Sequence, residues 1–83
     1  MNILPHDEAG LHRTGDIDSG YTVREINQIL GFEPNIQDDP YKVTNSWGFT
    51  VDGVPCGIWD YKGCRWSVYG PQEVFDRLFP RRS

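Results

Sequence analysis

Residues 47–58 decide the fold, and they read Trp-Gly-Phe-Thr-Val-Asp-Gly-Val-Pro-Cys-Gly-Ile. Large apolar residues alternate with small ones on both sides of Asp52-Gly53, the dipeptide most typical of a two-residue β-hairpin loop. In that register Val51 faces Val54, and all the large apolar residues of the stretch share one face of the sheet. Since a slip of one residue would scatter them over both faces, the pattern predicts the hairpin together with its register.

A third strand follows the turn at residues 60–63. A two-residue loop there would place Trp66 and Val68 on the face away from the other core residues, whereas a three-residue loop keeps them together. We therefore predict the three-residue loop, which sets Trp59 opposite Arg65 and Tyr69 opposite Pro55.

Two helices flank these strands. Residues 22–25 read Thr-Val-Arg-Glu, a capping box, and apolar residues then recur at spacings of three and four as far as Gly31. This predicts a helix over residues 22–30. Gly70-Pro71 opens a second helix, with proline at its first position, and this helix ends before Pro80. The predicted fold is α+β, in the order α-β-β-β-α: a three-stranded antiparallel meander with two helices packed on one face.

Residues 1–20 show neither helical nor strand periodicity and have the composition of a loop. We expect this segment to be an N-terminal arm that is flexible, or that is ordered only by the domain or by a partner. Residues 21–83 then form a single domain, because 83 residues are close to the length at which one core just suffices.

The charge is unevenly distributed along the chain. Eight basic and twelve acidic residues give a net charge of −4, which disfavours binding driven by nucleic-acid phosphates or by anionic lipid. Residues 1–39 carry −6 and residues 40–83 carry +2. Two interpretations remain: a solvated acidic leader on a neutral folded half, or an acidic surface that meets a basic partner.

The sequence offers little for catalysis. Cys56 and Cys64 are offset by four residues on adjacent predicted strands, about 13 Å and too far for a disulfide, which indicates two buried thiols in a reducing compartment. His6 and His12 lie in the arm, where nothing fixes a metal geometry. No catalytic motif is present, and no apolar run reaches the ~20 residues of a membrane span. We predict a cytoplasmic protein that is not an enzyme and holds no cofactor or metal.

The remaining candidate site is the face of the sheet away from the helices. The predicted partner-binding residues on this face are Trp59, Arg65, Tyr69, Gly48, Gly57, Thr50 and Ser67. Tryptophan, tyrosine and arginine are enriched at binding hot spots, and a floor of glycines admits close approach. The alternative is that the arm folds over this face through Ile3 and Leu4, and that Trp59 is structural.

The order helix–strand–strand–strand–helix over residues 22–79 is similar to that of double-stranded-RNA-binding domains, in topology alone. Their second helix opens with a lysine-rich stretch that contacts phosphates, whereas here residues 70–74 read Gly-Pro-Gln-Glu-Val. The resemblance therefore implies an arrangement of elements and not RNA binding. In size, acidity and aromatic density the chain also resembles the short inhibitor and accessory proteins that phages encode.

These observations predict a small, non-enzymatic protein-binding module. The phage resemblance implies an inhibitor or accessory factor acting on a cytoplasmic host enzyme, such as a nucleic-acid-handling one. The alternative is a binder of single-stranded nucleic acid or nucleotides that stacks bases on Trp59 and Tyr69. Self-association is also expected, either through the open face or through the edge of the strand at residues 45–51, which lacks proline and lysine.

Overall fold

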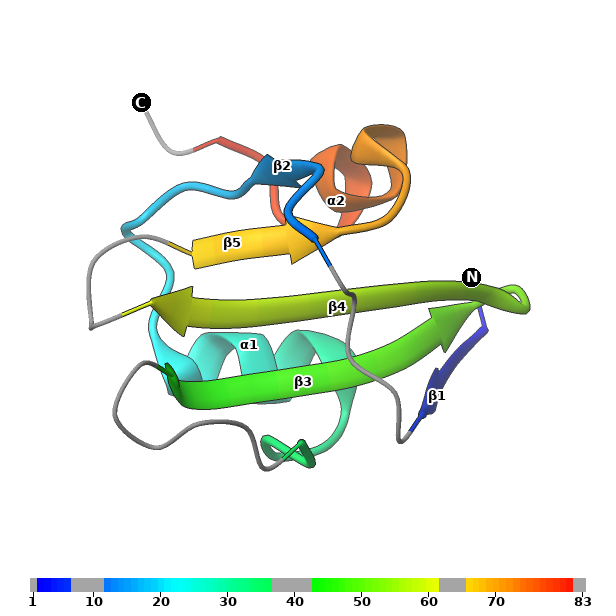
Figure 1. Cartoon of the computed structure of the whole chain (residues 1–83), viewed down its shortest axis with the longest axis horizontal. Helices are drawn as coiled ribbons and strands as arrows, with labels where there is room; N and C mark the ends of the chain where they lie inside the picture. The colour runs from blue at the N-terminus through cyan, green and yellow to red at the C-terminus, as the bar shows by residue number, and fades with distance from the viewer. Residues whose placement is uncertain (1, 7–11, 37–42, 62–65, 82–83) are drawn as a thin grey trace.

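The computed structural model describes residues 2–6, 12–36, 43–61 and 66–81. It is a small α+β fold in which a five-stranded antiparallel sheet is backed by two helices (Figure 1). The elements in chain order are β1 (Ile3–Pro5), β2 (Gly15–Asp16), α1 (Val23–Leu30), β3 (Val43–Val51), β4 (Val54–Tyr61), β5 (Trp66–Tyr69) and α2 (Gln72–Leu78). The strands lie in the order β1-β3-β4-β5-β2, so the predicted meander forms the centre of the sheet.

The central hairpin has the predicted register. Val51 pairs with Val54, and the pairing continues to Trp47 opposite Ile58. Asp52 and Gly53 have φ angles of 52° and 84°, as a tight turn with two left-handed residues requires. Near its start β3 has an irregularity in register, where the Asp60 carboxylate accepts hydrogen bonds from the Asn45 backbone and side chain at 2.8 and 3.1 Å. This buried aspartate supports the backbone where the regular ladder is interrupted.

Helix α1 begins as its sequence predicts. The Thr22 hydroxyl accepts from the Glu25 amide, the Glu25 carboxylate accepts from the Thr22 amide, and Gly31 ends the helix at a φ of 91°. Pro71 precedes α2 as its N-cap and is not its first helical residue. Both helices contribute to the same core as the inner face of the sheet. The buried apolar residues are Ile17, Tyr21, Ile26, Leu30, Trp47, Phe49, Val51, Cys56, Ile58, Trp66, Val68, Phe75 and Phe79.

The sheet is wider than predicted because two pieces of the expected arm pair with it. Strand β1 pairs with β3, and β2 pairs with β5, so the two lie at opposite edges (Figure 1). These strands are three and two residues long, and both contain poor strand formers. Their conformation therefore comes from backbone pairing with longer neighbours and leaves no periodic pattern in the sequence.

The expectation that residues 45–51 form an open edge is wrong. Beyond β1, the side chain of Asn35 continues the pairing: it accepts from the Gly48 amide at 2.9 Å and donates to the Gly48 carbonyl at 3.0 Å. The backbone amide of Asn35 donates to the Ser46 carbonyl. One asparagine thus replaces a short stretch of strand and covers this part of the β3 edge.

Candidate partner-binding face

The outer face is the side of β3, β4 and β5 that points away from the helices. Within the described residues it carries the side chains predicted for it, because the alternation of inward and outward residues is as expected. The β4–β5 register, however, differs from the prediction by two residues: Trp59 lies opposite Ser67, and Tyr69 lies opposite Gly57. A shift of two keeps every residue on its face, so the hydrophobic pattern could not distinguish the two registers. Arg65, the predicted neighbour of Trp59, lies outside the described residues.

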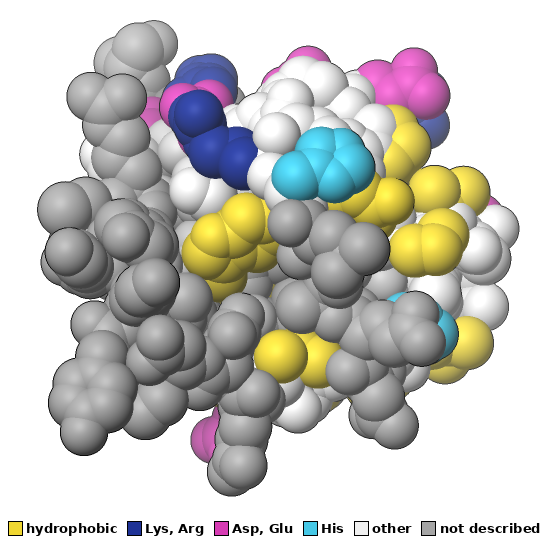
Figure 2. All heavy atoms as spheres, viewed as in Figure 1, with side chains coloured by type: hydrophobic (Ala, Val, Ile, Leu, Met, Phe, Trp, Pro, Cys, Tyr) yellow, Lys and Arg dark blue, Asp and Glu magenta, His cyan; other side chains and the backbone are white. Residues whose placement is uncertain are grey.

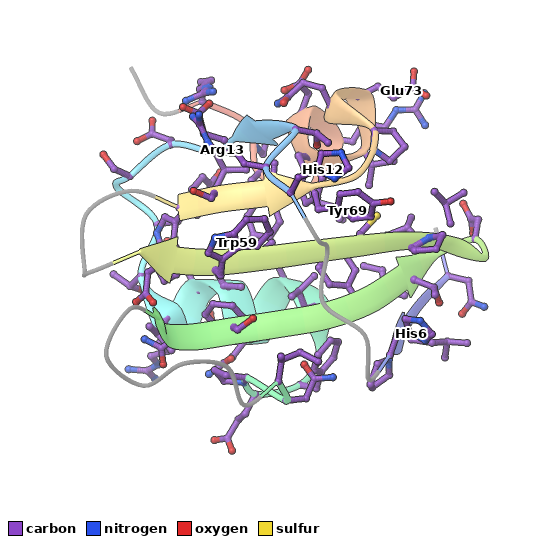
Figure 3. The ribbon with its side chains drawn as sticks, viewed as in Figure 1. His6, His12, Arg13, Trp59, Tyr69 and Glu73 are labelled. Carbon is purple, nitrogen blue, oxygen red and sulfur yellow. The ribbon has the colours of Figure 1, made fainter. Side chains whose placement is uncertain are left out.

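The observed register brings the two outer aromatic residues closer than predicted. Tyr69 is two residues beyond Ser67, the residue opposite Trp59, which makes Trp59 and Tyr69 diagonal neighbours on adjacent strands. Diagonal positions are about 7–8 Å apart, within reach of aromatic side chains. Both side chains are half-buried. Figure 3 shows them on the same side of the sheet, away from α1.

The predicted floor of this face is only partly accessible. Gly48 lies opposite Gly57, as predicted, and both glycines are buried. Ser67 is 9% exposed, whereas Thr50 is half-buried. The accessible part of the predicted set, within the described residues, therefore consists of Trp59, Tyr69 and Thr50.

His12 joins this face, although the sequence did not predict it. Its imidazole ring packs edge-on against Tyr69, with ring centroids 5.3 Å apart (Figure 3). Thr14 holds the segment in place, since its amide donates to the Val68 carbonyl and its hydroxyl donates to the Gly70 carbonyl. Figure 2 shows this side of the molecule, with hydrophobic side chains and a histidine at the surface. Such a contact depends on β2 pairing with β5, which has no periodic pattern in the sequence.

The three tryptophans differ in how their indole N–H groups are bonded. The Trp47 indole donates to the Asn27 side-chain oxygen at 3.0 Å, and the Trp66 indole donates to the Tyr21 carbonyl at 2.7 Å. No residue in the described part of the chain accepts a hydrogen bond from the Trp59 indole. Trp59 therefore carries a donor that is available to a molecule outside these residues.

The other residues considered for chemistry lie apart from this face or from one another. Cys56 is buried on the inner face, and burial raises the pKa of its thiol to about 11, which keeps it protonated at neutral pH. His6 lies beside β1 and His12 beside β5, near opposite edges of the sheet (Figure 3). In the described ranges no three metal-ligating side chains gather.

A cluster of charged and polar side chains surrounds Asp16 in β2. Its carboxylate contacts the guanidinium of Arg81 at 2.7 Å and that of Arg13 at 3.4 Å. The Asp16 carbonyl also accepts from the side chains of Gln72 and Arg81. These contacts attach the end of the chain to β2 and cover part of the outer edge of that strand, which is a structural role.

Models of known protein families, curated protein sequences and solved structures were compared with the chain, and none matches it. No helix among the described residues is long and apolar enough to cross a membrane.

Proposed function

We propose that this protein is a small, non-enzymatic protein-binding module whose outer face engages its partner through Trp59 and Tyr69. One observation carries the proposal: the Trp59 indole has no acceptor among the described residues and lies diagonally next to a second half-buried aromatic ring. Tryptophan and tyrosine combine a large apolar surface with one polar group, and for this reason they dominate binding hot spots.

A non-catalytic role is supported by the state of Cys56. Its pKa, raised to about 11 by burial, disfavours the thiolate that a nucleophile requires. We propose a cytoplasmic setting in which the module acts as a phage-type inhibitor or accessory factor on a host enzyme, such as one that handles nucleic acid.

The test is a capture experiment at physiological salt, with the immobilised full chain and bacterial lysate used both before and after nuclease treatment. We expect a protein that the wild type retains, and that Trp59→Ala loses with about a 2 kcal/mol weakening of binding, as a hot-spot truncation does. Gln28→Ala is the control, because Gln28 is exposed on α1, the helix that packs on the opposite, inner face of the sheet. This control should retain the same protein.

Two results would count against the proposal. If Trp59→Ala retains the same protein, the outer face does not take part in partner binding. Retention that disappears after nuclease treatment would favour the alternative, in which Trp59 and Tyr69 stack the bases of a single strand.

A further inference from the structure

A second exposed surface lies on the inner side of the sheet, between the tip of the β3–β4 hairpin and α2. It contains a hollow of about 210 Å³, lined by Val51, Asp52, Val54, Pro71, Glu73, Val74 and Arg77. We call these seven residues the hairpin–helix patch. Val54 at its wall is 42% exposed, although it follows a tight turn where a polar residue would serve as well.

The rim of the patch carries charges of both signs. Glu73 and Arg77 are exposed and stand four residues apart on α2, a spacing at which an ion pair within the helix is possible. Their side chains nevertheless form no ion pair, and neither has another bonded partner within the described chain. Asp52 adds a second carboxylate, which accepts a hydrogen bond from the Asn2 amide at 2.8 Å.

We propose that the hairpin–helix patch is the interface of a symmetric dimer, with a second copy of this chain as its occupant. In a two-fold symmetric dimer the same surface of both copies forms the interface. If one residue contacts a different residue of the other copy, symmetry produces the same contact a second time with the copies exchanged. Glu73 of one copy then faces Arg77 of the other, and Arg77 faces Glu73. An unpaired acid and an unpaired base beside one apolar hollow satisfy this requirement for self-complementarity.

The apolar part of the patch supplies the shape for such contact. The exposed Val54 of each copy would enter the hollow of the other, which is large enough for a valine side chain. Burial of two such side chains stabilises the association, and the reciprocal charges set its orientation. This interface is distinct from the outer face, so it leaves Trp59 and Tyr69 free for a different protein.

The test uses sedimentation velocity of the full chain over a range of micromolar concentrations. We expect the wild type to shift towards twice its 9.5 kDa mass as concentration rises. Glu73→Arg alone places two arginines opposite each other across the interface, and Arg77→Glu alone places two glutamates there. Each single variant should dimerise about tenfold more weakly or worse, because like charges face each other.

The decisive measurement mixes these two single variants. In the mixed pair every arginine faces a glutamate again, so a heterodimer should form at concentrations at which each variant alone is monomeric. Each variant has the same fold and the same helix in both measurements, so a loss of helix stability cannot produce this result. Trp59→Ala should dimerise like the wild type.

Three outcomes would overturn the proposal. The first is a wild-type chain that stays at 9.5 kDa over the whole concentration range. The second is a mixture of the two variants that remains monomeric although both variants melt as folded proteins. The third is a dimer that is lost with Trp59→Ala, since that result would place the interface on the outer face.

Discussion

Trp66 on the inner face and Trp59 on the outer face occupy adjacent strands, yet their indole groups have different surroundings. Trp66 is 8% exposed, packs edge-on against Trp47 at 5.5 Å, and donates to a backbone carbonyl at 2.7 Å. Trp59 is half-buried and has no such acceptor in the described chain. The comparison shows that residue type alone does not assign a tryptophan to the core, whereas its position in the alternation of the strand does.

The inner tryptophans connect the sheet to the chain around α1. The acceptor for Trp47 is a side chain of α1, and the acceptor for Trp66 is the carbonyl of Tyr21, just before the N-cap. A buried indole N–H requires such a partner, because leaving it unbonded in an apolar core costs free energy. Each inner tryptophan therefore positions a helix as well as filling space.

The largest expected effect is a loss of stability when the inner-face tryptophan Trp66 is truncated. Trp66→Ala should lower the free energy of unfolding by about 3–5 kcal/mol, because it leaves a large cavity and removes an indole hydrogen bond. Trp59→Ala is the matched control and should cost about 1 kcal/mol or less, as a change at an accessible site does. Urea unfolding followed by circular dichroism measures both.

Equal losses for the two variants would contradict the assignment. Trp59 would then be a structural residue, and the outer face would not be available for a partner. The alternative raised at the outset, in which Ile3 and Leu4 cover Trp59, would not explain such a result, because both residues pair with β3 at the edge of the sheet.

The central fold could be predicted from the sequence because it rests on local rules. The turn at Asp52-Gly53, the alternation on either side of it and the capping box at Thr22 each specify one geometry. The observed hairpin register, the start of α1 and the inward-facing residues of β3 and β4 follow directly from them.

The parts that the sequence did not predict depend on distant partners. Strands β1 and β2 take their conformation from backbone pairing with β3 and β5. Beyond the end of β1, the side chain of Asn35 pairs with Gly48 of β3. The β4–β5 register was missed because a shift of two residues leaves the hydrophobic pattern unchanged. Consequently Trp59 and Tyr69 were predicted on the correct face but with the wrong neighbours, and His12 was not predicted there at all.

A smaller loss of stability is expected when the acceptor of a buried indole N–H is removed. Asn27→Ala removes the acceptor of the fully buried Trp47 indole and should cost about 1–3 kcal/mol, the penalty of an unsatisfied buried donor. Gln28→Ala, at the exposed neighbouring position of α1, controls for the better helix propensity of alanine. The measurement is again urea unfolding. Similar stabilities for the two variants would show that the indole bond in the core contributes little.

The last prediction concerns the pH dependence of the inner face, an effect that is absent at neutral pH. Burial raises the pKa of the Cys56 thiol from 9.0 to about 11, so the folded protein keeps a proton that the unfolded chain loses above pH 9. Stability must then fall as pH rises between these two values, because the unfolded state binds fewer protons there. Cys56→Ala lacks this titration and serves as the reference. We expect the difference in free energy of unfolding between wild type and variant to be constant below pH 9 and to decrease from pH 9 to 11. Parallel stability curves over that range would mean that the thiol is accessible to water, and that the inner face is less apolar around Cys56 than its burial indicates.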